Sequence, residues 1–307
     1  MSALNQDSPR GFAFAVTAYV LWGFLPIYMK AVAHIPPSEV IAHRVIWSFP
    51  IAAVVLWLTG RTGELKTALM TPRMLGMAMV TATLVSLNWG IYVWSIAAGH
   101  ALDAALGYYI NPLFSVFLGA VLLRETLSRA QIAAIVLAAA AVAILTWQAG
   151  QLPIAAIGLT LSWGAYAFLK KWLPIGPNQG FMLEVALLLP FALAYVAWLV
   201  ATGQNHMLAG NASDTWLLLG CGAVTAIPLM IYANGAKLLR LSTIGILQYI
   251  APTMIFLIAV AVFGEEFDQA RMIAFPLIWL SLIIYTASLV RRSRKAPPRG
   301  PLTTPAR

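Results

Sequence analysis

Ten apolar segments follow one another along the chain, and each is about as long as a membrane-spanning helix. Their residue ranges are 12–33, 38–58, 74–98, 104–123, 129–148, 152–172, 180–201, 215–237, 243–263 and 270–290. A helix needs roughly 20 apolar residues to cross the hydrocarbon core of a bilayer. Only 9% of the 307 residues are charged, whereas an ordinary soluble domain has about 25%. We therefore predict an all-α integral membrane protein with ten transmembrane helices, embedded in the lipid bilayer.

The Lys and Arg residues predict how these helices are oriented, because cytoplasmic loops carry an excess of them. If the N-terminus lies in the cytoplasm, all but three of the 19 basic residues fall on that side, the exceptions being Lys30, Arg44 and Arg271. We therefore expect both termini in the cytoplasm, with 291–307 as a disordered basic tail. Since the basic residues are spread over several loops, topology explains the net charge of +9, and no nucleic-acid partner is indicated.

A sequence repeat divides the chain into two halves. The stretch 107–131, GYYINPLFSVFLGAVLLRETLSRAQ, has a counterpart 140 residues later, LQYIAPTMIFLIAVAVFGEEFDQAR. Identical residues mark this alignment, among them Tyr109 and Tyr249, Ile110 and Ile250, Pro112 and Pro252, and Glu125 and Glu265. Each half has five predicted helices, an odd number, so the second copy must enter the membrane from the opposite side. We predict two inverted five-helix repeats, 11–148 and 152–290, the construction of many secondary transporters.

The second predicted helix carries the strongest polar signal. Glu39, His43 and Trp47 are spaced four residues apart and share one face, and Arg44 lies beside them. Charged residues within an apolar helix are costly unless they face protein or water. The functional interpretation is a substrate or proton site in a central cavity, where Arg44 attracts an anionic or carbonyl group. The alternative is structural: Glu39 lies at the membrane interface, and Arg44 extends toward that interface or pairs with Glu39.

Polar residues on other helices complete the predicted cavity. Asn88 and Tyr92 share one face of the third helix, although an Asn in mid-membrane also serves to hold helices together. Pro112 and Pro252 remove a backbone hydrogen bond and permit a kink, so we interpret them as gate elements. The remaining predicted cavity residues lie beside these prolines: Tyr109, Asn111, Gln248 and Tyr249.

Two further features of the repeat lead to expectations. Glu125 and Glu265 close the repeated unit, and we predict that each caps the N-terminus of the helix that follows it. Asn111 aligns with Ala251, and we expect substrate-specific contacts at this position, where the two copies differ.

The sequence gives no indication of catalysis or of a cofactor. It contains no cluster of metal-ligating residues, no nucleotide-binding glycine loop and no Ser–His–Asp arrangement. Its single cysteine, Cys221, excludes a disulfide framework. Without a P-loop the chain cannot drive transport by its own ATP hydrolysis. We therefore predict that it is not an enzyme and that it holds no metal and no cofactor.

Four motifs resemble one known family. They are HRVIWS at 43–48, NW at 88–89, LGYYINPL at 106–113 and LSTIGILQYIAPT at 241–253. These motifs are similar to those of the RarD-type permeases, which belong to the EamA family of the drug/metabolite transporter superfamily. The resemblance spans the chain from Gly11 to about Val290 and implies a bacterial inner-membrane permease built from two EamA repeats. The loop at 202–214 and the Arg- and Pro-rich tail depart from the family pattern.

Residues and resemblance together predict a secondary transporter of small amphipathic metabolites or drugs that works by alternating access. The expected direction, export, follows from the resemblance alone. Proton coupling through His43 or Glu39 and uncoupled facilitated diffusion fit the same residues, and the oligomeric state stays open. Two alternatives are a membrane-embedded enzyme and a sensor or scaffold that transports nothing.

Overall fold

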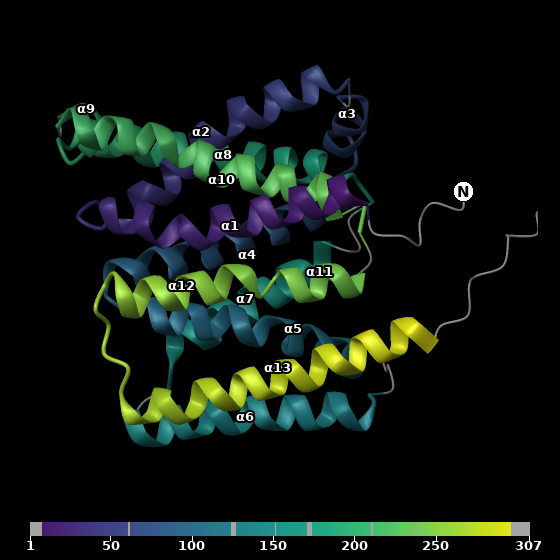
Figure 1. Ribbon diagram of the computed structural model, residues 1–307. Coiled ribbons are helices and arrows are strands. Elements are labelled where there is room, and N and C mark those ends of the chain that lie inside the picture. Colours follow the sequence, from purple (N-terminus) through teal and green to yellow (C-terminus); the bar gives the residue numbers. More distant parts are fainter. Residues whose placement is uncertain are drawn as a thin grey trace, which may run out of the picture.

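The computed structural model describes residues 8–60, 62–123, 127–150, 152–170, 174–209, 211–236, 238–239 and 241–295. Within these ranges the chain is helical and contains no β-strand (Figure 1). The helices, in chain order, are α1 (Pro9–Ala31), α2 (Pro37–Leu58), α3 (Gly63–Leu69), α4 (Pro72–Ala97), α5 (Ala101–Leu123), α6 (Arg129–Ala149), α7 (Ile154–Lys170), α8 (Pro177–Ala201), α9 (His206–Ala209), α10 (Ala212–Ala236), α11 (Leu241–Leu247), α12 (Ile250–Ala261) and α13 (Gln269–Lys295).

Length and composition separate the helices into spans and connectors. Eight are long and apolar enough to cross a membrane, and two shorter apolar helices, α7 and α12, accompany them. Proline begins α1, α2, α4 and α8, where its fixed φ suits the first turn and its missing N–H costs nothing. The predicted all-α membrane fold is confirmed at this level, and each of the ten predicted apolar segments overlaps at least one of these helices.

The ninth predicted segment, 243–263, is interrupted instead of forming one span. It is divided into α11 and α12, with the break at Gln248 and Tyr249. Pro252 gives the physical reason, because its ring has no N–H and crowds the carbonyl group four residues earlier, which is that of Gln248. Pro112, its counterpart in the repeat, lies inside the continuous helix α5. Of the two aligned prolines, only Pro252 therefore stands next to a break in its helix.

The C-terminal helix extends further than expected. Residues 291–295 belong to α13 and are helical, where the sequence predicts the start of a disordered tail. Cations near a helix C-terminus are stabilised by the helix dipole, which favours this extension through a basic stretch. Residues 296–307 and Glu125 lie outside the described part of the chain, so the tail and the first of the two predicted caps are not part of this description.

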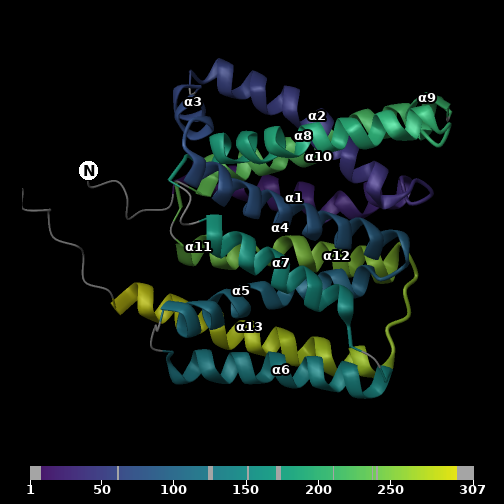
Figure 2. The ribbon, with the colours of Figure 1, turned by 180° about the vertical axis from the view of Figure 1, so that it is seen from behind.

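The helices lie side by side and run between two ends of the bundle (Figures 1 and 2). Helix α1 packs along α10 and α4 along α7, while α5 packs along α7 and α12 along α1. Three further pairs, α2 with α8, α5 with α12 and α6 with α13, bring together helices at equivalent positions of the two halves. If each helix is replaced by its counterpart in the other half (α1–α6 against α7–α13), the pair α1–α10 becomes α7–α4 and the pair α5–α7 becomes α12–α1. The three pairs of equivalent helices become themselves. Helices α6 and α13 form one edge of the bundle, and α2 and α8 form the other.

Small residues let helix α6 approach α13 closely. Ala134, Ala138 and Ala141 are spaced four and three residues apart, so they share one face of α6, and all three are buried. They belong to the same apolar cluster as Ala274 and Ile278 of α13. In membranes such small-residue faces are the usual means of close helix packing.

Three of the chain's four histidines, His34, His100 and His206, lie at one end of the bundle, which we call the histidine end, and the fourth, His43, lies in the second turn of α2, the helix that begins there. Polar links at this end join the first half to the second. His34 contacts Asp214 at 2.9 Å (Nε2 to Oδ1), and His206 contacts Glu39 at 2.7 Å (Nδ1 to Oε2). Arg271 contacts Asp103 at 3.4 Å (Nη2 to Oδ1). These contacts hold the two halves together at the histidine end.

Glu265 makes a further link between the halves, and it caps a different helix from the one predicted. Its two carboxylate oxygens accept hydrogen bonds from the backbone N–H groups of Ala101 (2.7 Å) and Leu102 (2.9 Å). These groups open helix α5 of the first half, whereas the sequence suggested a cap for α13, the helix that follows Glu265. The carboxylate satisfies two unpaired donors and also meets the positive end of the α5 dipole.

We predict that Glu265→Ala destabilises the protein, because both N–H groups at the start of α5 lose their acceptor. The free energy of unfolding should fall by about 1–2 kcal/mol, the usual value of a helix N-cap. Thermal unfolding of the purified protein in detergent measures this as a lower melting temperature. The neighbouring exposed Glu266 provides the matched control, and Glu266→Ala should leave the melting temperature unchanged. Equal effects of the two variants would contradict the cap.

Candidate functional site

A cavity of about 150 Å³ lies between the two halves, and we call it the central cavity. Helices α1, α2, α4 and α5 of the first half contribute to it, as do α7, α10, α12 and the α11–α12 break of the second half. Its lining is made of aromatic rings, a few apolar side chains and several polar groups: Tyr19, Trp22, Leu25, Arg44, Asn88, Trp89, Tyr92, Tyr108, Asn111, Trp163, Thr225, Leu229, Tyr232, Gln248, Ala251, Pro252 and Ile255.

Arg44 supplies the positive charge of the central cavity. Its Nε donates a hydrogen bond to the Thr225 hydroxyl at 2.9 Å, and its guanidinium group lies over the ring of Trp89, 4.6 Å from the ring centroid. Thr225 in turn donates to the carbonyl oxygen of Cys221. Arg44 is 3% exposed, so these contacts fix a buried cation between α2, α4 and α10.

The charge of Arg44 is not balanced by a carboxylate in the described part of the chain. The ionisable side chains that interact with it electrostatically are those of Cys221, Tyr28, Tyr92 and Tyr108, and none of these is a carboxylate. Its Nη1 atom is buried and has no hydrogen-bond partner among the described residues. The alternative expectation, that Arg44 pairs with Glu39, is not what the structure shows.

Two further polar atoms of the cavity lining are buried without a partner in the described ranges. They are the hydroxyl of Tyr92 and the Oδ1 atom of Asn111. A buried polar group without a hydrogen bond costs about 1–3 kcal/mol. Such groups in a cavity wall indicate a site that a ligand or water completes. Asn111 and Ala251, the aligned pair at which the two copies differ, both line this cavity.

Asn88 also lines the cavity, but it mainly joins three helices. Its Nδ2 group donates to the Leu159 carbonyl (3.2 Å) and the Ser162 hydroxyl (3.0 Å) of α7, and its Oδ1 accepts from Tyr108 of α5 (3.3 Å). These bonds use both the donor and the acceptor of the amide. Of the two interpretations of Asn88, the structure favours helix association.

Aromatic residues form much of the cavity wall, and most of them are not among the residues that the sequence predicts for the site. Tyr19, Trp22 and Tyr232 contact one another with ring centroids 5.4–5.7 Å apart. Trp163 lies on the other copy of the repeat at the position of Trp22, within the matching motifs WGFLPIYMK and WGAYAFLKK. That repeated Trp-Gly pair is the signal that could have placed both rings in the site.

The other predicted residues of helix α2 lie away from the central cavity. Glu39 is fully buried and accepts hydrogen bonds from the backbone N–H and the Nδ1 of His206, at 2.8 and 2.7 Å. The Nε2 of His43 lies 4.0 Å from Glu39, and its Nδ1 accepts from the indole of Trp47 at 3.2 Å. Thus Glu39, His43 and Trp47 form a chain of contacts toward the histidine end, and His206 is a member that the sequence did not reveal.

Of the predicted residues around the two prolines, some line the central cavity and others do not. Gln248 and Pro252 line the central cavity, whereas Pro112, Tyr109 and Tyr249 do not. The Tyr109 hydroxyl instead shares a hydrogen bond of 2.8 Å with Thr253, which ties α5 to α12.

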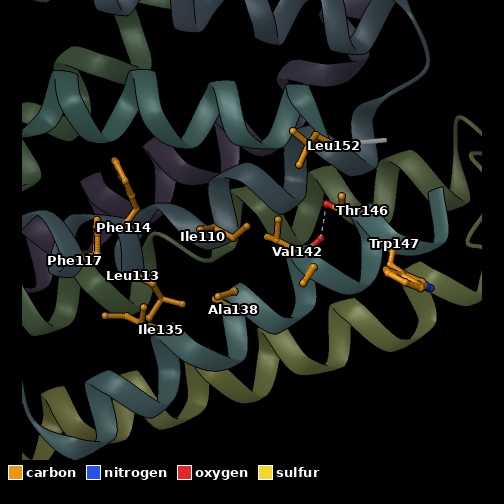
Figure 3. Close-up of a pocket in the computed structure, with 12 residues that line it drawn as sticks. Ile110, Leu113, Phe114, Phe117, Ile135, Ala138, Val142, Thr146, Trp147 and Leu152 are labelled. Carbon is orange, nitrogen blue, oxygen red and sulfur yellow. Dashed lines mark hydrogen bonds between the residues drawn. The ribbon is translucent and has the colours of Figure 1, made fainter. Parts of the chain in front are cut away.

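A second cavity of about 550 Å³ lies between α5 and α6 and is different in character (Figure 3). Its walls are almost wholly apolar, and the side chains that line it include Leu113, Phe114 and Phe117 of α5 and Ile135 of α6. Its side-chain polar groups are the hydroxyl of Thr146, which is bonded to the carbonyl oxygen of Val142, and the indole N–H of the exposed Trp147. This lining contains no charged residue and no buried polar atom without a partner among the described residues, so the central cavity is the candidate functional site.

Comparisons with known proteins agree on one family. The model of the EamA-like transporter family matches residues 9–147. An uncharacterized transporter of Vibrio cholerae is 41% identical over 300 residues, which cover 96% of this chain and 98% of that protein. Protein RarD of Escherichia coli is 36% identical over 290 residues, with 94% and 98% covered. A solved crystal structure has the same fold, with a TM-score of 0.59 and 21% identity over 92% of this chain and 97% of that one.

We predict that Asn88→Leu destabilises the protein, whereas Tyr92→Phe does not. The first change removes the hydrogen bonds between α4, α5 and α7 and leaves Tyr108 without its acceptor, which should lower the free energy of unfolding by roughly 1–3 kcal/mol. The second change removes a hydroxyl that has no partner among the described residues, so its effect should stay within about 0.5 kcal/mol. Melting temperatures of the purified variants test the contrast. A loss for Tyr92→Phe as large as that for Asn88→Leu would show that the Tyr92 hydroxyl is bonded within the protein.

Proposed function

The chain belongs to the EamA-like transporter family, and we propose that it is a secondary transporter whose central cavity binds small amphipathic metabolites or drugs. The observation that carries this proposal is the composition of the cavity wall. Rings from both halves surround three buried polar atoms without partners in the described chain, those of Arg44, Tyr92 and Asn111. Apolar walls with a few convergent polar groups are typical of small-molecule sites.

We further propose that the two halves are inverted repeats that rock against each other around this cavity. The exchange of contacts between the halves supports this, because swapping the two halves turns each of these helix pairs into another observed pair. A site between two such halves is reached alternately from either side of the membrane. In this cycle the cross-links at the histidine end, such as Glu39 with His206, close one side. Opening that side requires them to break.

The broken helix between α11 and α12 supports a role as a moving part. Gln248 and Pro252 lie at and just after the break, and both line the central cavity. A break of this kind frees backbone carbonyl groups and allows the two helix segments to move separately. Irregular backbone inside a membrane protein occurs where it lines a cavity. We propose that this segment gates the site.

The bacterial relatives and the basic residues support the proposed location. We propose that the chain lies in the bacterial inner membrane, with both termini in the cytoplasm and the histidine end on the outside. Export is the proposed direction, by analogy with the superfamily. The proposed driving force is a gradient of the solute or of protons and not ATP hydrolysis by this chain, because the sequence contains no P-loop.

We predict that Ala251→Trp abolishes transport, because the indole fills the central cavity. The purified full-length protein is placed in liposomes, and exchange of labelled benzoate, benzamide, benzylamine and chloramphenicol is measured against protein-free liposomes. Ala139 lines the apolar cavity between α5 and α6, so Ala139→Trp is the matched control and should transport as the parent does. Size-exclusion profiles and melting temperatures establish that both variants fold. If no solute exchanges in the parent protein, the transporter proposal fails; if Ala251→Trp transports normally, the path lies elsewhere.

The proposed orientation predicts the behaviour of a reporter enzyme that is active only outside the cytoplasm. Fused after Arg291, at the C-terminal end, the reporter should be silent. Fused after Gly99, in the loop between α4 and α5, it should be active. The reverse pattern would place the histidine end in the cytoplasm.

A further inference from the structure

The charge of the central cavity limits what can bind there. Arg44 brings one positive charge, and no carboxylate in the described ranges lies close enough to neutralise it. A buried charge without a counter-charge costs several kcal/mol, and an anion that enters the cavity removes this cost. A cation would meet the guanidinium group without any acid to hold it. The electrostatics therefore favour a solute with a single negative charge.

The hydrogen-bond donors and acceptors in the wall of the central cavity indicate which kind of anion binds there. Arg44 has a free Nη1 and Tyr92 has a free hydroxyl, each within the described chain, and both can donate hydrogen bonds. A carboxylate accepts several such bonds, and those from a guanidinium group are about twice as strong as bonds between neutral groups. The Oδ1 of Asn111 is an acceptor and suits a hydroxyl or N–H on the same solute.

The aromatic rings and the volume define the rest of the solute. Trp22, Trp89, Trp163 and Tyr232 present rings to the cavity, and such walls favour a planar body that packs face to face or edge to face. The volume is about 150 Å³, and an apolar cavity of that size accommodates benzene. The cavity therefore has room for about one ring and a small substituent.

We propose that the central cavity selects a small organic monoanion: one planar, preferably aromatic, ring that bears one carboxylate. The carboxylate accepts from Arg44 and Tyr92, and the ring packs among the tryptophans. This inference rests on the proposed transport function, since it names the substrate class of the same cavity. Its test separates binding from movement across the membrane.

Benzoate serves as the probe, with neutral benzamide and cationic benzylamine as comparators of nearly the same shape. Binding is measured at pH 7 as the rise in melting temperature of the full-length protein, because a ligand that binds only the folded state stabilises it. Benzoate should bind at least about tenfold more tightly than either comparator, the factor expected from a hydrogen bond to a charged group. In liposomes, benzoate should exchange faster than benzamide and benzylamine after subtraction of protein-free liposomes.

Variants test whether Arg44 causes the preference for benzoate over benzamide and benzylamine. Arg44→Gln should abolish the preference for benzoate, whereas Arg44→Lys, which retains the charge but not the forked donors, should keep part of it. Arg10→Gln is the matched control, since Arg10 is exposed and far from the cavity lining, and it should bind benzoate as the parent does. If Arg44→Gln does not fold, Tyr92→Phe and Arg44→Lys carry the test, and both should weaken benzoate more than benzamide.

The outcomes distinguish the two proposals. Equal or tighter binding of benzamide or benzylamine, or an unchanged preference in all Arg44 and Tyr92 variants, overturns the monoanion inference even if solutes cross the membrane. Selective binding of benzoate without exchange of any solute leaves the anion site intact and overturns the transporter proposal.

Discussion

A polar group inside a bilayer must find its partner within the protein, and the arrangement of this bundle depends on that constraint. Asn88 meets it completely, because its amide joins α4 to α5 and α7 through three hydrogen bonds. Arg44 meets it in part, through Thr225 and the face of Trp89, and keeps one nitrogen unpaired among the described residues. The same requirement for hydrogen-bond partners thus holds helices together at Asn88 and leaves a nitrogen of Arg44 available to a ligand.

The positions of the helices could be predicted from the sequence, because the length of an apolar span is set by the thickness of the bilayer. The break before Pro252 could also be anticipated, since a proline disturbs the carbonyl four residues earlier. That Pro112 sits in an uninterrupted helix could not, because its surroundings in α5 decide whether the backbone opens. The cap made by Glu265 was assigned to the wrong helix, because a carboxylate can reach across the bundle as easily as along the chain.

Helical spacing in the sequence shows that Glu39, His43 and Trp47 share one face of α2, but it does not show which part of the protein that face contacts. Glu39, His43 and Trp47 do contact one another in series, yet their face turns toward His206. Arg44 follows His43 directly, so its side chain is turned by about 100° around the helix axis, and it lines the central cavity. His206 stands on the four-residue helix α9, in a loop with no apolar periodicity, so nothing in the sequence pattern assigned it a partner. The aromatic wall was missed because rings in a membrane protein are common, and only contact shows which of them meet.

The cross-links at the histidine end give the two ends of the bundle different physical sensitivities. His34 is 53% exposed and Arg271 about a fifth exposed, so their attractions to Asp214 and Asp103 are reached by dissolved ions. Salt weakens such exposed pairs, and it also reaches the contact between Glu39 and His206 from the side of His206, whose side chain is 33% exposed, although Glu39 itself is fully buried. The ionic strength of the solution at that end therefore adjusts how firmly the two halves are held together there. Arg44, shielded from both compartments, keeps a constant field whatever the composition of the surrounding solution.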